Sequence, residues 1–304
     1  MRREFIDQLT ELALADQSIM LLTGDLGFGV LERFRDLVPQ QFLNLGIAEQ
    51  SMMGIAAGLA KCGFRPFVYS IGNFPSMRCM EQIRNDVVYM DLPVTIVALG
   101  AGFSYGSAGY SHHLVDDIGA MRAFDLEVYV PDGPSCSKKV INRIIERRRP
   151  AYVRLGRGGE CDSKTAIHLI DSYEVRIADK NQVIILSVGS ISTEIDEVLD
   201  LLKTSSINSV HLSVECFSDI SKIRNILEKW SGPIVTVEEH VLKGGFGSFI
   251  LEELSMLNKK ILRIGIRELN RKLVGSQEFL RSSYGLNSSA IYDQIYSFVE
   301  EVGV

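Results

Sequence analysis

The chain has 304 residues, of which 46% are hydrophobic and 23% charged, and its net charge is -6. These values exclude a disordered chain and are typical of a globular protein long enough for two domains. The acidic balance argues against a nucleic-acid surface, because phosphate binding relies on clustered Lys and Arg.

The five cysteines are scattered, and no pair has the close spacing of common zinc sites, so we expect reduced thiols and no metal ligands in this chain. No apolar stretch is long enough for a signal core or a membrane span. We therefore expect a cytoplasmic protein with no membrane partner.

Helices and strands alternate along the first half of the predicted fold. Phe5, Leu9, Leu12 and Leu14 recur about once per turn and predict a helix that ends near Asp16. Short apolar runs predict strands at 19–23, 42–45, 67–70, 94–99, 127–130 and 152–155, with helices at 48–61 and 77–90. Nearly continuous apolar strands of this kind indicate an α/β fold, with a mainly parallel sheet covered by helices on both faces.

The regular alternation stops after Leu155, where Gly156, Gly158 and Gly159 follow in quick succession. We place a first domain at 1–160, a linker at 161–180 and a second domain at 181–304. Apolar runs near 183–188, 210–214 and 234–237 predict strands with helices between them. The second unit is therefore expected to be a smaller domain of the same α/β class.

Glu49 lies in the first turn of the predicted helix 48–61, directly after a strand. That helix is rich in small residues, namely Gly54, Ala56, Ala57, Gly58 and Ala60. Small residues allow a helix to approach a neighbour closely, so we expect a tight interface and little contact between Glu49 and solvent. Burial favours the protonated, hydrogen-bond-donating form of a carboxyl group. The spacing leaves one alternative open, in which Glu49 only complements the helix dipole from the solvent side.

Several motifs in this chain, in the same order, resemble those of one enzyme family. Gly46-Ile-Ala-Glu49-Gln is similar to the glutamate motif in the pyrimidine-binding domain of transketolases, which also occurs in deoxyxylulose-phosphate synthases and the beta subunits of 2-oxo acid dehydrogenases. Further matches are Leu22-Thr-Gly-Asp25-Leu-Gly, Pro66-Phe-Val-Tyr-Ser, Glu81-Gln-Ile-Arg84-Asn, residues 106–117 and Arg154-Leu-Gly-Arg157. Residues 183–304, with Val237-Glu-Glu-His240 and Gly244-Gly-Phe-Gly247, resemble the family's C-terminal domain.

The resemblance implies thiamine diphosphate as cofactor. The carboxyl group at Glu49 would hydrogen-bond the aminopyrimidine and favour its imino form, which takes the proton from the thiazolium carbon to give the ylide. Phe74 would stack on the pyrimidine, and Ile47 would touch the cofactor. Asp25 would lie beside the thiazolium at a subunit interface, although Gly-Asp after a strand is also ordinary turn chemistry. Ile71 stands where transketolases usually carry another Phe, so the pocket is less aromatic there.

The resemblance also assigns substrate contacts. His112 matches a histidine that contacts substrate, and His113 takes the place of a glutamine. Arg157, and more loosely Arg2, match arginines that grip the substrate phosphate, a role that suits a bidentate guanidinium. The alternative for Arg157 is a surface residue of the linker.

Two departures from the transketolase pattern concern the sugar. Ala108 stands where transketolases carry an acid that reads a sugar hydroxyl, and Gly100 stands where they carry another histidine. A site without a hydrogen-bonding partner no longer discriminates for the hydroxyl that the partner reads. We therefore expect substrates outside the usual pentose-phosphate set, in specialised sugar biosynthesis.

Neither Gly-Asp-Gly nor Asn-Asn occurs in this sequence, although such motifs hold the cofactor's diphosphate and its Mg²⁺ or Ca²⁺ in the family. The resemblance thus implies a split transketolase that transfers a two-carbon ketol unit, glycolaldehyde, only with a partner subunit that carries the diphosphate-binding domain. The implied assembly is a heterotetramer. The alternatives are the beta subunit of a 2-oxo acid or acetoin dehydrogenase, and a non-catalytic assembly subunit.

Overall fold

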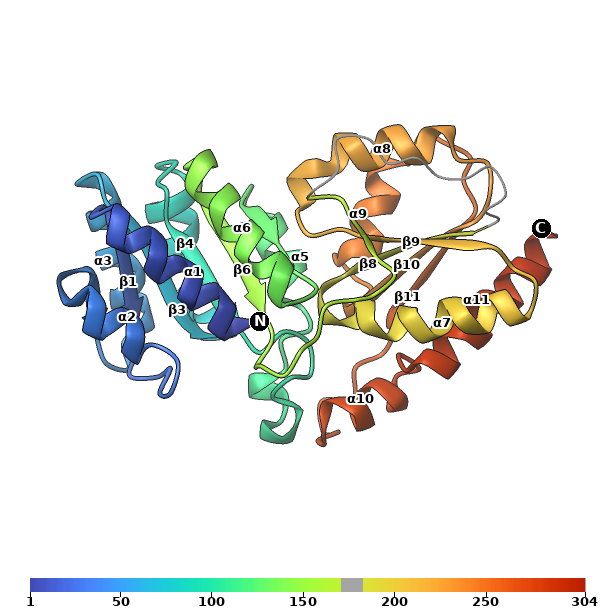
Figure 1. Ribbon diagram of the computed structural model, residues 1–304, viewed down its shortest axis with the longest axis horizontal. Coiled ribbons are helices and arrows are strands. Elements are labelled where there is room, and N and C mark those ends of the chain that lie inside the picture. The colour runs from blue at the N-terminus through green and yellow to red at the C-terminus, as the bar shows by residue number, and fades with distance from the viewer. Residues whose placement is uncertain (171–182, 304) are drawn as a thin grey trace.

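The computed structural model describes residues 1–170 and 183–303, which form two α/β units lying side by side along the long axis (Figure 1). The first is built on a parallel sheet of six strands in the order β2-β1-β3-β4-β6-β5. Its strands are β1 (Ile19–Thr23), β2 (Phe42–Asn44), β3 (Arg65–Ile71), β4 (Thr95–Leu99), β5 (Glu127–Tyr129) and β6 (Ala151–Leu155). Every residue of β1, β4, β5 and β6 is buried, which explains why these strands read as apolar runs.

Helices cover both faces of the first sheet, as the sequence predicts. On one face lie α1 (Arg2–Ala15), α2 (Glu32–Leu37) and α6 (Pro134–Arg147), whose apolar residues share a core cluster with Leu21 and Tyr69. On the other lie α3 (Glu49–Lys61) and α5 (Asp117–Arg122), whose apolar residues share a cluster with Leu22 and Val68. Successive side chains of a strand point to opposite faces, so neighbouring residues of β1 and β3 join different clusters.

The predicted continuous helix at 77–90 is wrong in detail. The segment consists of a 3₁₀ turn (Met77–Cys79), one turn of α-helix, α4 (Met80–Gln82), and a π-helical stretch (Ile83–Val88). The apolar residues Ile83 and Val87 still pack against the sheet on the α3 side. The periodicity therefore identified the buried face, while the hydrogen-bond pattern differs from a regular helix.

The second unit is a five-stranded parallel sheet in the order β11-β10-β8-β9-β7. Its strands are β7 (Ile167–His168), β8 (Val183–Val188), β9 (Ser209–Ser213), β10 (Ile234–Val241) and β11 (Ile261–Ile266). Its helices are α7 (Ser192–Thr204), α8 (Ile220–Lys229), α9 (Phe246–Glu253), α10 (Gln277–Ser283) and α11 (Ser288–Val302). Helices α7 and α11 share a core with Ile185 and Val235, whereas α8 and α9 pack with Ile184 and Leu186 on the opposite face. The fold class is confirmed for both units.

Part of the predicted linker belongs to the second sheet, because β7 pairs in parallel with β9. Residues 171–182 of the predicted linker lie outside the described residues, so the domain limits at 160 and 181 stay a prediction.

The two units meet through buried polar contacts as well as apolar ones. Arg154 of β6 pairs with Asp117, with 3.0 Å between Nε and Oδ2, and its guanidinium also donates to the carbonyl of Glu239 at 3.1 Å. Within the described parts of the chain, no helix is long and apolar enough to cross a membrane.

Candidate functional site

The candidate site lies at the carboxyl end of the first sheet, where the connections diverge. The loop after β1 leads to α2 on one face, and the loop after β2 leads to α3 on the other. Such a divergence leaves a crevice at the strand ends, which is where open parallel sheets bind ligands. The predicted site residues follow five strand ends in turn: Asp25 after β1, Glu49 after β2, Phe74 after β3, His112 after β4 and Arg157 after β6.

Glu49 opens helix α3 and is only 3% exposed, as the sequence predicts. Its carboxylate forms an ion pair with an arginine. Arg78, on the Met77–Cys79 turn, donates a hydrogen bond from Nη1 to Oε2 over 2.6 Å. The same guanidinium lies 4.5 Å from the centroid of the Phe74 ring. A planar cation thus lies against the aromatic face of Phe74 while it donates to the acid, an arrangement that combines an ion pair with a cation–π contact.

A row of ring contacts continues from Phe74 toward the second unit. The His112 ring lies edge-on to Phe74, with 5.5 Å between centroids, and 6.4 Å from the Tyr105 ring. The Arg157 guanidinium lies 5.5 Å from the centroid of Tyr105. Together these contacts form a continuous set, which we call the Glu49–Arg157 row: Glu49, Arg78, Phe74, His112, Tyr105 and Arg157.

Arg157 is exposed and lines a cavity of about 900 Å³ between the two units, together with Ser190 and Gln277 from the second one. Arg2 approaches the same region from helix α1, since its Nε would lie 3.6 Å from a β-carbon added at Gly158. The fold therefore brings the first helix and the end of β6 together. Two guanidinium groups so placed could hold an anion at the far end of the row from Glu49.

His113 does not occupy the predicted place. It is 2% exposed, its Nε2 donates to the carbonyl of Gly106 at 3.0 Å, and its ring lies edge-on to Phe103 at 5.2 Å. The side chain therefore holds the loop from within the core and does not reach its open surface. Neighbouring residues of an extended loop often point in opposite directions, and here it is His112 that faces the row. The predicted substrate contact of His113 is thus corrected to a structural role.

Asp25, Ile47 and Ile71 lie at the ends of the strands that precede the acid end of the row. Asp25 has a φ of 58° and exchanges hydrogen bonds with Asn44, its backbone nitrogen donating to Asn44 Oδ1 over 3.0 Å. This geometry matches the turn chemistry expected after a strand, while the carboxylate stays exposed. Ile47 is 79% exposed and Ile71 is half-buried at the end of β3. All three side chains are accessible to a ligand at the strand ends.

The structure gives a reason for glycine at position 100. The residue has a φ of +90°, and a β-carbon there would lie 2.1 Å from Cδ2 of Tyr105. The Tyr105 ring therefore fills the space that a larger residue 100 would need. Ala108, at the end of the 3₁₀ turn Gly106–Ala108, is exposed and offers no hydrogen-bonding group.

Helix α3 turns an uncovered surface outward. Gly54, Ile55 and Gly58 are exposed on this surface. Gly54 and Gly58 line a shallow hollow together with Tyr89 and Met90, which are 83% and 42% exposed. Large exposed apolar side chains beside small ones are typical of a surface that another chain covers. Of the small residues predicted to form a tight interface, Ala56, Ala57 and Ala60 pack in the core of the first unit, whereas Gly54 and Gly58 stay exposed.

Sequence reasoning missed Arg78 and Tyr105. Arg78 follows Phe74 by four residues, a spacing at which side chains on a helical turn can meet, and this was its only signal. No sequence pattern indicates Tyr105, because its contact with Arg157 joins residues far apart in the sequence.

Comparison with protein families finds a match along nearly the whole chain. Residues 1–159 match the transketolase pyrimidine-binding domain, and residues 173–291 match the transketolase C-terminal domain. Among curated proteins, one of the apulose-4-phosphate transketolase subunits of Phocaeicola vulgatus is 30% identical over 99% of this chain and 97% of its own length. A putative transketolase C-terminal section of Methanocaldococcus jannaschii is 33% identical over 97% and 95%.

Longer proteins match as well. A 1-deoxy-D-xylulose-5-phosphate synthase of Heliobacterium modesticaldum is 31% identical over 94% of this chain, which spans 45% of that protein. Among solved structures, a split gene transketolase in an inactive beta4 tetramer superposes with a TM-score of 0.83 at 26% identity, covering 98% of this chain and 97% of that one. Transketolase from Leishmania mexicana shares the fold, with a TM-score of 0.83 at 17% identity over 99% of this chain and 45% of its own.

Proposed function

The chain belongs to the transketolase family, and on that premise we propose that it is the pyrimidine-binding subunit of a two-component transketolase that transfers glycolaldehyde between phosphorylated sugars. The observation that carries the proposal is the Glu49–Arg157 row. It begins at a buried acid, passes an aromatic face and a histidine, and ends at an exposed arginine beside a cavity. A cofactor ring, a ketol group and a phosphate would occupy these positions in that order.

The acid end of the row fits an aminopyrimidine. Arg78 already places a flat group with N–H donors against Phe74 and Glu49, so the two side chains are arranged to hold such a group. Thiamine diphosphate, when bound, would supply a thiazolium ring whose carbon acts as nucleophile and which as a whole acts as electron sink. Glu49 would hold a proton at a carboxyl oxygen facing the ring, and Phe74 would fix the plane of the ring. Asp25, Ile47 and Ile71 would line the edge of the same pocket.

The other end of the row fits the substrate. His112 would donate to the oxygens of the ketol group, since its ring lies beside Phe74 on the open side of the loop. Arg157 and Arg2 would bind the phosphate, and Arg157 is steadied by the face of Tyr105. Residues that bind the substrate far from its reacting carbon raise the rate because they hold the substrate in the reactive position.

A partner subunit would supply what this chain lacks. The cofactor's diphosphate and its Mg²⁺ or Ca²⁺ need a second domain, because the motifs that hold them are absent from the sequence. The uncovered surface of α3, with Gly54, Ile55 and Gly58, offers a place for that partner or for a second copy. We infer a heterotetramer of two such pairs, acting in the cytoplasm.

The relatives favour this function over the alternatives. The full-length matches are, by name, a transketolase subunit and a transketolase C-terminal section, which supports a transketolase over the beta subunit of a 2-oxo acid dehydrogenase. The presence of both Glu49 and Phe74, each in contact with Arg78, supports a catalytic subunit over an assembly subunit. The relative from Phocaeicola vulgatus acts, by its name, on apulose 4-phosphate. Together with Gly100, Tyr105 and Ala108, this supports a specialised phosphorylated sugar as substrate.

A ketol-transfer assay on the complex with the partner subunit tests the proposal. Donor ketoses are supplied with and without a phosphate group. Arg157→Ala should lower kcat/KM for the phosphorylated donor roughly 10- to 100-fold and barely affect the unphosphorylated one, because only the first loses a charged hydrogen bond. Arg224→Ala, which removes an exposed arginine whose ion-pair partner among the described residues is Glu228 on α8, is the matched control. Equal losses for both donors, or no transfer by the wild-type complex, would refute the proposal.

A further inference from the structure

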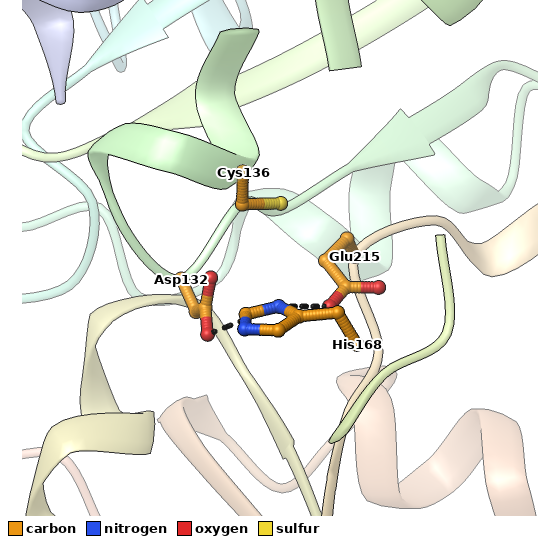
Figure 2. A group of neighbouring side chains, drawn as sticks. All are labelled: Asp132, Cys136, His168 and Glu215. Atoms are coloured by element: carbon orange, nitrogen blue, oxygen red, sulfur yellow. Dashed lines mark hydrogen bonds and ion pairs between the residues drawn. The ribbon is translucent and has the colours of Figure 1, made fainter. Parts of the chain in front are cut away.

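Four metal-ligand side chains meet at the junction of the two units, away from the Glu49–Arg157 row. Asp132 lies in the loop after β5 and Cys136 in the first turns of α6, while His168 comes from β7 and Glu215 follows β9. Asp132, Cys136 and Glu215 are at most 1% exposed, and the side chain of His168 is 22% exposed. Figure 2 shows the imidazole of His168 lying between the two carboxylates, with the sulfur of Cys136 beside them.

The distances are those of a compact cluster. His168 Nδ1 lies 2.9 Å from Glu215 Oε1 and 3.6 Å from Asp132 Oδ2. One ligand atom from each of the four residues can be chosen so that all lie within 4.8 Å of one another. Such a group is uncommon in a protein interior, because ionisable side chains are seldom fully buried unless they are paired.

Asp132 is the member of the cluster whose carboxylate stays unsatisfied. It is fully buried, and among residues 1–170 and 183–303 neither of its oxygens has a hydrogen-bond partner. A buried carboxylate without donors is costly, so a group that satisfies it is expected beside it. The imidazole of His168, at 3.6 Å, is too far away for a hydrogen bond. Among the described residues, Asp132 therefore has no hydrogen-bond donor at its carboxylate, although it faces the centre of the cluster.

We propose that Asp132, Cys136, His168 and Glu215 together bind one Zn²⁺ ion. A nitrogen, a sulfur and two carboxylate oxygens form a ligand set that zinc accepts, whereas Mg²⁺ and Ca²⁺ select oxygen alone. Tetrahedral zinc with bonds of about 2.0 to 2.3 Å places its ligand atoms about 3.5 Å apart, so a contraction of about 1 Å closes the cluster. Coordination would release the proton of Cys136, whose pKa burial raises in the metal-free protein.

The site would be structural. All four positions are filled by protein, which leaves no place for a substrate. Glu215 is oriented by the backbone, since the nitrogen of Ile170 donates to its Oε2 over 3.0 Å, as outer hydrogen bonds usually orient metal ligands. The ion would tie β5 and α6 of the first unit to β7 and β9 of the second, where the nitrogen of Val130 already donates to the carbonyl of Glu215 at 2.8 Å.

Metal content tests the proposal. The full-length chain is saturated with Zn²⁺, freed of loosely bound ions and analysed for metal. We expect one zinc per chain in the wild type and in Cys62→Ser, which removes an exposed thiol, and at least roughly tenfold weaker binding in Cys136→Ser. Less than stoichiometric zinc in the wild type, or unchanged binding in Cys136→Ser, would overturn the proposal.

A second measurement does not depend on the folding of a ligand variant. A variant with both exposed thiols removed, Cys62→Ser with Cys161→Ser, keeps the buried cluster complete. Titration with Co²⁺ should give a cobalt–thiolate charge-transfer band that saturates at one ion per chain, and excess Zn²⁺ should abolish it. Absence of the thiolate band would exclude Cys136 as a ligand and overturn the proposal.

Discussion

The guanidinium of Arg78 donates a hydrogen bond to the carboxylate of Glu49, with 2.6 Å between Nη1 and Oε2. Because the same group lies over the Phe74 ring, it occupies the position that the proposed function assigns to the cofactor's pyrimidine. The arginine must therefore move before any ring can stack there.

Removing this occupant should strengthen cofactor binding. Arg78 pairs with a buried acid but is itself half-exposed, so the contact that the cofactor must break is modest. We expect Arg78→Ala to lower the Kd for thiamine diphosphate of the complex by roughly 2- to 10-fold, corresponding to about 0.5 to 1.5 kcal/mol. Calorimetric titration measures this. Arg224→Ala, which removes an exposed arginine of α8, is the control, and an unchanged or higher Kd for Arg78→Ala would contradict the expectation.

Glu49→Gln should abolish turnover without unfolding the chain. The amide keeps the shape of the side chain but cannot hold and return a proton, and loss of general acid–base chemistry typically costs 10²- to 10⁴-fold in rate, so we expect a loss of at least roughly 100-fold. The rate of ketol transfer and the far-ultraviolet dichroism spectrum are to be measured together. Glu146→Gln, on the exposed side of α6, should keep normal activity. Activity of the Glu49 variant within a factor of a few of wild type would remove Glu49 from the mechanism.

Gly100 and Gly54 should respond to alanine in opposite directions. At Gly100 a β-carbon meets Tyr105 and the backbone is left-handed, so Gly100→Ala should destabilise the chain by at least about 1 to 3 kcal/mol. Gly54 lies in helix α3 with no atom within 4 Å of an added β-carbon, so Gly54→Ala should stabilise the isolated chain by about 0.5 to 1 kcal/mol. Denaturant unfolding of both variants measures the contrast. Equal effects would show that Tyr105 does not fill the space beside Gly100.

Buried His240, at the junction of the units, should contribute a loss of stability in mild acid, while its neighbour Glu238, whose pKa burial raises to about 7, contributes in the opposite direction. His240 is fully buried, its Nδ1 donating to the carbonyl of Val241 and its Nε2 accepting from the nitrogen of Ile118. Burial lowers its pKa from 6.5 to about 4. The charge of Asp117 raises this pKa, and the charge of Arg154 lowers it further. The carboxylate of Glu238 lies 3.8 Å from Nδ1. A proton on Nε2 would break the bond from Ile118.

The sign of the effect follows from the direction of the shift. As the pH falls below 6.5, the unfolded chain takes up a proton that the folded chain refuses, so stability is lost between pH 6.5 and about 4. The slope for one such group is about 1.4 kcal/mol per pH unit. His240→Gln should remove this part of the slope, while His112→Gln, on the exposed loop, should leave it unchanged. An identical pH dependence in His240→Gln and wild type would contradict the assignment. Burial also lowers the pKa of His211 to about 3, so His211 adds a further slope to the wild type and to both variants.

Apolar runs predict the two sheets well because parallel strands covered on both faces must be apolar along their whole length. Strands β1, β4 and β8 begin and end within a residue of the predicted limits. The same rule fails for short or edge elements. Strand β7 has only two residues, and β11 is only partly buried, so neither presents a continuous apolar run.

Sequence could predict those site residues that belong to motifs. It could not predict the contacts that these residues make with side chains elsewhere in the chain. Glu49 and Phe74 are found through the family resemblance, and in the structure both contact the guanidinium of Arg78. His113 was misplaced because a pair of adjacent histidines does not reveal which one faces the core. The cluster proposed to bind zinc combines a single cysteine with side chains up to about 80 residues apart in the sequence, and no local spacing rule detects such a set.

The central claim is that this chain forms only half of a cofactor site, and titration with thiamine diphosphate in the presence of Mg²⁺ tests it most directly. We expect no saturable binding to the isolated chain, tight binding to its mixture with the partner subunit, and weakened binding when the mixture contains Phe74→Ala. Tight binding by the isolated chain, or an absence of binding in both samples, would contradict the account.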